Sequence, residues 1–275
     1  GLQDLDAGII RITYPDSFIE DPARILRAIT MQARFDFVLD KETQTKAHEA
    51  LELGLLNVRR NKRAQDELKE ILTSSTCVTS IRLLDHMGSN LIGLPLHASR
   101  LQKTNLLSAL HEVQNHDGPA SENALWIAPL LLWIGDVPSV ELHMILKDFG
   151  LSDRLAEACR SWQRKERTVR LLLEHGTTRD TDALASAIDR LPRPILAILE
   201  ARLLCNEKES GRKMLELVRS RMAEPPLITG SDILALGLRE SKNIGALLAE
   251  VRRRQLNGSL HSHEEAIAFL HAAIG

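Results

Sequence analysis

Apolar residues along this chain recur at the three- and four-residue spacing of amphipathic helices, not at the alternating spacing of strands. Runs of β-branched residues are short, and residues 9–13 can be read as one short strand or as an extended hinge. Glycine, proline and Ser-Thr positions divide the rest of the chain into segments of ordinary helix length. The pattern therefore predicts an all-α protein.

One helix is predicted to begin at Asp21-Pro22. Proline suits the first helical position, because its φ is preset and its missing N–H costs no hydrogen bond there. A neighbouring stripe of the same helix holds Arg24, Arg27 and Arg34, and a solvated position is favoured for Arg34. The apolar side of this helix is expected to contain Ile25, Ala28, Ile29, Ala33 and Phe35.

Two further helix starts follow from capping residues. Asp40 is predicted to cap a helix that stops at Gly54. Near the end of the chain, Ser262 and Glu265 have the spacing of a capping box for the last helix.

Length and composition narrow the classes of protein. A chain of 275 residues can form two or three helical domains with real cores. Its formal net charge is −2, so nucleic-acid binding would depend on local basic patches. Three widely spaced cysteines argue against a disulfide framework or a thiolate metal site. With no membrane-spanning stretch or signal peptide found, we expect a cytoplasmic location.

Asp21 and Arg24 are the residues with the most specific chemistry. Residues at i and i+3 are neighbours on a helix, so the pair can present one acceptor beside one forked donor. Adenine and cytosine each offer an amino donor beside a ring-nitrogen acceptor, whereas guanine and uracil reverse that order. The pair could therefore read A or C without a nucleic-acid template. The alternative is a surface ion pair near a helix start.

A basic segment, residues 59–63, leads into a second predicted helix. One interpretation sets Arg59, Arg60 and Arg63 against triphosphate or RNA phosphates. The other is a helix carrying charge pairs four residues apart, such as Arg63 with Glu67. Arg63 could do both.

The tail after Pro225-Pro226 is predicted to form a helical hairpin. Ser231-Asp232 would cap a helix ending at Gly237, and a short turn through Lys242 would lead into a helix starting near Asn243. Exposed N–H groups at that second start could seat a phosphate. Residues 252–254, three arginines, follow on the same helix. The alternative is an ordinary hairpin with a solvated basic face.

Five segments of the sequence carry a family resemblance. They are Gly1-Leu2-Gln3-Asp4-Leu5 with Ile10-Arg11, Glu20-Asp21-Pro22-Ala23-Arg24, Lys62-Arg63 with Glu67-Leu68, the run from Pro226 to Leu234, and Asn243-Ile244-Gly245. Together they resemble the hinge, the Glu-Asp-x-x-Arg motif, the Glu-Arg-x-x-x-Glu-Leu segment and the tail of the class II tRNA nucleotidyltransferase and poly(A) polymerase family. The match is specific over residues 1–72 and about 225–260, and weak between them.

Four positions depart from the family pattern. The family usually has Arg at Thr30, Phe at Met31, Gly at Asp36 and Glu at Lys62. The change at position 30 removes one cation from the first helix.

The resemblance implies an elongated all-α architecture with a hinge and neck over residues 1–72, a helical body over 73–206 and a helical tail over 207–275. It implies nucleotide binding by Asp21, Arg24, Arg27 and Arg63. We assign RNA binding to Arg59, Arg60, Lys242, Asn243, Arg252 and Arg253, and no residue to catalysis or to a metal.

The function implied is the addition of CCA or A to tRNA 3′ ends, with tRNA as partner and ATP and CTP as substrates. In the family an N-terminal head with an Asp-x-Asp pair holds Mg²⁺. That head and its Asp-x-Asp pair are expected to be missing, so this chain alone is predicted to be inactive. The alternatives are a poly(A) polymerase of the same family and a non-catalytic helical RNA-binding or scaffold module.

Overall fold

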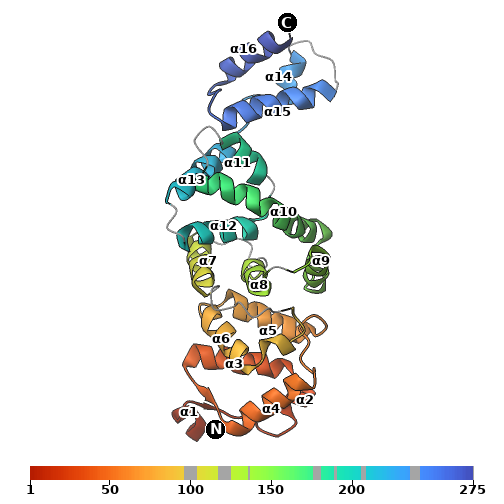
Figure 1. Ribbon diagram of the computed structural model, residues 1–275, viewed down its shortest axis with the longest axis vertical. Coiled ribbons are helices and arrows are strands. Elements are labelled where there is room, and N and C mark those ends of the chain that lie inside the picture. The colour runs from red at the N-terminus through yellow and green to blue at the C-terminus, as the bar shows by residue number, and fades with distance from the viewer. Residues whose placement is uncertain are drawn as a thin grey trace. The chain divides into compact units, whose positions relative to one another are not determined.

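The computed structural model describes residues 1–95, 104–116, 125–135, 137–175, 181–188, 191–205, 209–235 and 242–274. Within these ranges the protein is mostly helical, which confirms the predicted fold class (Figure 1). The chain forms two compact units. Unit 1 comprises Gly1–Gln163 and Pro192–Cys205, and unit 2 comprises Arg164–Leu191 and Asn206–Gly275. In the part of the chain that the model describes, no helix is both long and apolar enough to span a membrane.

The elements of unit 1 are α1 (Leu2–Asp6), β1 (Ile9–Ile10), α2 (Ser17–Glu20), α3 (Ala23–Phe35), β2 (Val38–Leu39), α4 (Lys41–Glu52), α5 (Lys62–Thr73), α6 (Cys77–Met87), η1 (Ser89–Leu91), α7 (Thr104–His116), α8 (Ile127–Ile134), α9 (Ser139–Asp148) and α12 (Arg193–Cys205). The long helix α10 (Asp153–His175) contributes residues to both units. Unit 2 continues with α11 (Thr181–Ile188), α13 (Glu209–Ala223), α14 (Gly230–Ala235), α15 (Lys242–Leu256) and α16 (His263–Ile274).

A small parallel sheet fixes the first part of the chain. Ile9 of β1 lies opposite Val38 of β2, so the first reading of residues 9–13, a short strand, is correct for its first two residues. Directly after β2, the Asp40 carboxylate accepts a hydrogen bond from the Thr43 N–H at 2.9 Å and caps α4 as predicted. Arg11 follows β1, and its Nη1 lies 2.6 Å from Asp40 Oδ2. An ion pair therefore also connects the two segments.

Helix α3 begins at Ala23, with Pro22 at the cap position. Its buried side contains Ile25, Ala28 and Ile29 as predicted, and also Leu26, which the prediction omitted. Phe35 was expected on that side but is 55% exposed. The reason is its place in the last turn, where its ring contacts are with the neighbouring residues Arg34 and Phe37.

The end of α3 depends on an unusual backbone position. Asp36 has a φ of 57° and ψ of 34°, in the left-handed region, and is the sole non-glycine residue with positive φ in the described ranges. Glycine adopts this conformation without strain, and aspartate is among the residues that tolerate it. The family's usual glycine at this position therefore has a direct geometric explanation.

Helix α3 packs against α5 and α6. The contact is apolar, because the fully buried side chains of this region include Ile25 and Ile29 of α3 and Leu68, Ile71 and Leu72 of α5. Burial of such side chains is worth about 1.5–3 kcal/mol each. This packing places the first turns of α3 beside those of α5, although about 40 residues separate them in the sequence.

Three side chains from the segment 59–69 donate hydrogen bonds to residues at the C-terminus of α9. Arg59 Nε lies 2.6 Å from Asp148 Oδ2, and the buried Gln65 amide donates to the Asp148 carbonyl at 2.9 Å. Lys69 donates to the Phe149 carbonyl at 3.2 Å and lies over the Trp126 ring. Burial lowers the pKa of Lys69 below its ordinary value. Cations and donors at a helix C-terminus are favourable because carbonyls there lack helical partners.

Two of the predicted core tryptophans are confirmed. Trp126 and Trp133 are buried in unit 1, and the side chain of Trp162 lies outside the described residues.

In unit 2, helices α11, α13 and α15 pack on one another. The tail has a hydrophobic cluster of its own, formed by Ile228, Ile233, Val251, Leu260, Ala266 and Leu270. Asp232 is not the N-cap residue of α14, contrary to the prediction, because it lies inside the helix. Its carboxylate accepts from the Thr229 N–H at 2.7 Å instead, so Thr229 occupies the cap position and the helix begins earlier than predicted.

The capping-box prediction for the last helix holds in part. Ser262 Oγ accepts from the Glu265 N–H at 3.2 Å, as a cap should, but the Glu265 carboxylate reaches the N–H of His261 rather than that of Ser262. Gly237, the predicted end of α14, lies outside the described residues.

Candidate functional site

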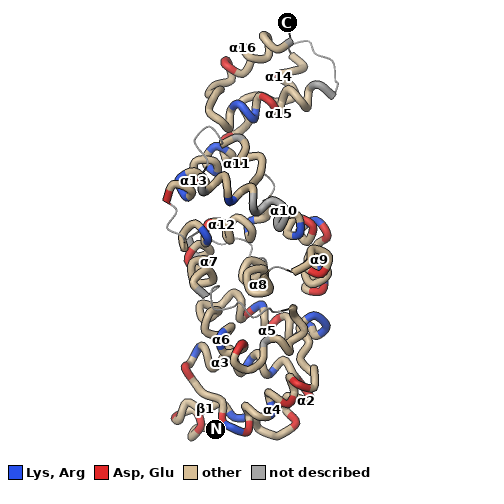
Figure 2. The backbone as a smooth tube through the Cα atoms, in the orientation of Figure 1, with Lys and Arg blue, Asp and Glu red and all other residues tan. Residues whose placement is uncertain are grey.

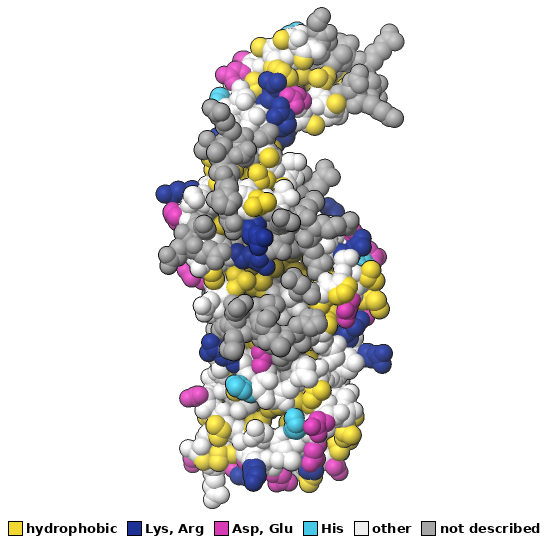
Figure 3. Space-filling model, in the orientation of Figure 1, with side chains coloured by type: hydrophobic (Ala, Val, Ile, Leu, Met, Phe, Trp, Pro, Cys, Tyr) yellow, Lys and Arg dark blue, Asp and Glu magenta, His cyan; other side chains and the backbone are white. Residues whose placement is uncertain are grey.

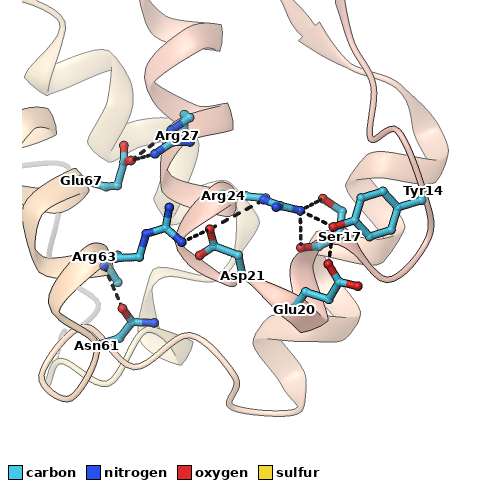
Figure 4. Close-up of polar contacts among 10 residues, drawn as sticks. Tyr14, Ser17, Glu20, Asp21, Arg24, Arg27, Asn61, Arg63 and Glu67 are labelled. Atoms are coloured by element: carbon cyan, nitrogen blue, oxygen red, sulfur yellow. Dashed lines mark hydrogen bonds and ion pairs between the residues drawn. The ribbon is translucent and has the colours of Figure 1, made fainter.

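Asp21 is the centre of the candidate site. It follows α2 with a φ of −141° and a ψ of 86°, and its side chain lies toward Arg24 of α3 and Arg63 of α5 (Figure 4). Its carboxylate is only 12% exposed, and Oδ2 lies 2.9 Å from Arg63 Nη1 and 3.7 Å from Arg24 Nε. The structure therefore brings together three of the four residues that the sequence assigned to nucleotide binding.

Arg24 is held from the side opposite Asp21. Its Nη1 donates to the Tyr14 hydroxyl at 2.7 Å, to Ser17 Oγ at 2.9 Å and to the Ser17 carbonyl at 3.2 Å. The hydrogen bond to Tyr14 raises the pKa of Arg24 above its ordinary value, so the guanidinium stays charged. The side chain remains 37% exposed. Arg24 is thus fixed in direction while part of its fork still faces solvent.

Sequence reasoning missed Tyr14. Its hydroxyl also contacts Glu20, the residue directly before Asp21, and Arg24 lies 5.7 Å from the centre of its ring. Tyr14 is the only tyrosine in the chain. The position of this single tyrosine, ten residues before Arg24, could have suggested a contact, but only the fold shows it.

Arg27, the fourth predicted nucleotide-binding residue, is committed to another partner. Its Nε donates to Glu67 Oε1 at 3.0 Å, and Nη2 contacts the same oxygen. In place of the alternative pairing of Arg63 with Glu67, the structure has Arg27 paired with Glu67 and Arg63 paired with Asp21. Both pairs arise because α3 and α5 lie side by side (Figure 4).

The residues of the basic segment before α5 differ in their contacts and exposure. Arg59 is half-buried against Asp148, as described above, whereas Arg60 is exposed. Lys62 forms an ion pair with Asp66 at 2.8 Å, four residues along the helix. The Asn61 side chain caps α5 by accepting from the Ala64 N–H. Of the predicted RNA-binding residues in this segment, Arg60 has the more open position.

The predicted basic residues of the tail also differ from one another. Arg252 Nη2 donates to the Met222 carbonyl at 2.9 Å, which connects α15 with the end of α13. Arg253 is exposed and pairs with Glu250 at 2.8 Å. Hydrogen bonds from Arg253 and Arg254 lower the pKa of Glu250 to about 2. The side chains of Lys242 and Asn243 lie outside the described residues.

Charge is mixed over the molecule. Lys and Arg alternate with Asp and Glu along the backbone, including at α15 (Figure 2). On the face seen in the space-filling view, the coloured basic side chains are likewise interspersed with acidic ones (Figure 3). This pattern agrees with the near-neutral net charge of −2.

A metal ion has no evident seat in this part of the protein. Among the described residues, no group of three or more His, Cys, Asp or Glu side chains could hold one. An Asp-x-Asp spacing does occur at Asp4 and Asp6, contrary to the expectation from sequence. Asp4 pairs with the amino terminus and with Arg11 at 3.3 Å, and both bonds lower its pKa. A second such spacing includes Asp180, outside the described ranges.

The geometry of Asp21 and Arg24 permits recognition of a flat polar edge. Among the described residues, the hydrogen bonds of the Arg24 guanidinium are made by Nη1, and the ion pairs of Asp21 with Arg24 and Arg63 are closest at Oδ2. Asp21 Oδ1 and Arg24 Nη2 are thus an acceptor and a donor on neighbouring side chains. An amino group with an adjacent ring nitrogen, as on adenine and cytosine, presents the complementary donor and acceptor.

No protein-family model matches the chain. Among curated proteins, the A-adding tRNA nucleotidyltransferase of Halalkalibacterium halodurans is 26% identical over 98% of this chain. The match covers 60% of that relative, so the chain spans about three fifths of its length.

Solved structures with the same fold include CCA-adding enzymes in complex with ATP and with CTP, each with a TM-score of 0.82. They are 21% and 22% identical in sequence, and the match covers all of this chain and 66% and 65% of theirs. The Thermotoga maritima CCA-adding enzyme, solved with tRNA, matches with a TM-score of 0.80 and 21% identity over all of this chain and 66% of its own.

Proposed function

We propose that this chain, which resembles the class II tRNA nucleotidyltransferase family, is the nucleotide- and tRNA-binding part of an enzyme that adds A or CCA to tRNA 3′ ends. The relative described above is longer than this chain, so the activity proposed is that of the whole enzyme. The nucleotides are ATP and CTP, which are the ligands of two solved proteins of the same fold.

The observation that carries the proposal is the side-by-side arrangement of Asp21 and Arg24. Asp21 Oδ1 accepts from the exocyclic amino group of adenine or cytosine, and the Arg24 fork donates to the adjacent ring nitrogen. Guanine and uracil present a carbonyl to the carboxylate, so they are rejected by repulsion between two acceptors. Arg63 contributes by holding Asp21, and Arg27 by fixing α3 against Glu67.

The role proposed for this chain is selection of the nucleotide and binding of the tRNA. It orients the base, and thereby the triphosphate, and it binds the acceptor arm of tRNA through phosphates. Binding of this kind reads the shape of the RNA more than its sequence.

The nucleotide part is tested by measuring the binding of ATP, CTP, GTP and UTP to the chain by isothermal titration calorimetry. We expect ATP and CTP to bind at least about tenfold more tightly than GTP and UTP, because a well-placed pair of base contacts is worth about 1–3 kcal/mol. Equal affinity for the four nucleotides would contradict the proposed function.

The tRNA part is tested by the salt dependence of binding. If the chain neutralises two tRNA phosphates, raising the salt from about 50 to about 200 mM should weaken binding roughly tenfold. We expect Arg60→Ala and Arg253→Ala each to reduce the slope of log K against log salt by about one unit. Arg212→Ala is the matched control, since Arg212 is also an exposed arginine paired with a nearby glutamate. A tRNA affinity that does not change with salt would contradict the proposed contacts with tRNA phosphates.

A further inference from the structure

The orientation of Arg24 is set by one corner of its guanidinium. A guanidinium is a rigid planar fork, and Nη1 carries two of its five N–H groups. In this protein Nη1 has three acceptors within reach, the Tyr14 hydroxyl and two oxygens of Ser17. The edge formed by Nε and Nη2 is on the side that faces Asp21. The group that holds Nη1 therefore decides where the recognition edge of Arg24 points.

Of these acceptors, the Tyr14 hydroxyl is the one that another residue orients. It donates its own proton to the Glu20 carboxylate, which accepts only, so an oxygen lone pair faces Arg24. Glu20 is covalently next to Asp21, and Tyr14 therefore links the backbone at Asp21 to the guanidinium of Arg24 (Figure 4). The Tyr14 ring also lies against the guanidinium.

We infer that Tyr14 is a positioning residue for base selection, acting through Arg24. The inference rests on the proposed function. With Tyr14 in place, the Arg24 fork is held at the angle that matches an adenine or cytosine edge. Without the hydroxyl, Nη1 keeps only the Ser17 oxygens, so the plane of the guanidinium can rotate and its donors can reach the carbonyl of guanine or uracil. The loss is in discrimination more than in affinity.

The test variant is Tyr14→Phe, which removes the hydroxyl and keeps the ring. Tyr14 is 36% exposed, so the change leaves the core intact. We expect the ratio of ATP to GTP affinity to fall about tenfold, the size of one hydrogen bond to a charged group. Thr45→Val is the matched control, because it removes an exposed hydroxyl that only contacts its own helix. An unchanged ratio, or equal loss for all four nucleotides, overturns the positioning role.

A second measurement does not depend on nucleotide. With arginine labelled by ¹⁵N, NMR reports how fast the Nη groups of Arg24 rotate. We expect slow rotation in the unmodified chain and faster, averaged signals in Tyr14→Phe. Unchanged rotation would overturn the inference even if nucleotides are discriminated. If instead the unmodified chain binds all four nucleotides equally, the proposed function fails, whereas the NMR comparison still shows whether Tyr14 holds Arg24.

Discussion

Replacing Arg24 with alanine is expected to remove the preference for ATP and CTP over GTP and UTP. In the proposed recognition pair, Arg24 supplies the donor half, and the hydrogen bond from its Nη1 to the Tyr14 hydroxyl holds the guanidinium and raises its pKa further above its ordinary value. Loss of a bidentate base contact costs about 1–3 kcal/mol of discrimination, so the affinity ratio should fall by roughly 10- to 100-fold. Titration calorimetry with the four nucleotides measures it directly. In the whole enzyme, the same loss should appear as misincorporation of G and U.

Arg34→Ala is the control for this experiment. Arg34 belongs to the same helix and is also exposed, but it lies over the Phe35 ring, away from Asp21. It should leave the ratio unchanged. A fall of equal size in both variants would mean that the charge of α3, not the Arg24 fork, attracts the nucleotide.

Asp21→Asn examines the other half of the pair. The amide keeps one acceptor oxygen and adds two donor hydrogens, so it can also pair with the carbonyl of guanine or uracil. The preference for ATP and CTP should therefore decrease, because GTP and UTP bind more tightly to this variant. The change also removes the charge that faces Arg63 at 2.9 Å. A variant that still excludes GTP and UTP would contradict the carboxylate's role.

The second large effect is expected in the core beneath the site. Ile25 follows Arg24 in α3 and is fully buried where α3 packs on α5 and α6. Ile25→Ala should lower the free energy of unfolding by about 2–5 kcal/mol, because the lost methyl groups leave a cavity that the neighbours only partly fill. Urea unfolding monitored by the fluorescence of the buried Trp126 and Trp133 measures the change.

Ile19→Ala gives the matched comparison. Ile19 is 55% exposed on α2, and its truncation should change the unfolding free energy by less than about 0.5 kcal/mol. An equally small loss in Ile25→Ala would show that the packing of α3 on α5 contributes little to the stability of this unit.

Much of the local structure could be predicted from sequence because it depends on residues close together in the chain. Asp40 caps α4 through its contact with Thr43, three residues away. The start of α3 after Asp21 follows from the conformation of proline. The proximity of Asp21 and Arg24 follows from helical spacing, and the Asp21 Oδ2 to Arg24 Nε distance of 3.7 Å agrees with it.

Contacts across helices could not be predicted in the same way. Helical spacing alone offered Glu67 as the partner of Arg63, but the packing of α3 on α5 gives Glu67 a partner in Arg27 of α3 and gives Arg63 a partner in Asp21, just before α3. Tyr14 approaches Arg24 only because residues 11–16 turn back after β1. The exposed Phe35 has a similar cause, since the left-handed turn at Asp36 ends α3 before its last residues are covered.

The contacts on the C-terminus of α9 have a consequence for any attempt to isolate helices α3 and α5. A polypeptide cut near residue 72 would leave the ends of Arg59, Gln65 and Lys69 facing water in place of carbonyls and aromatic rings. Such a minimal fragment should fray at α5 and exchange its amide hydrogens quickly there. A fragment that extends through residue 205 retains those acceptors together with α12, which packs on α7 and α8, so it is the better choice for spectroscopy.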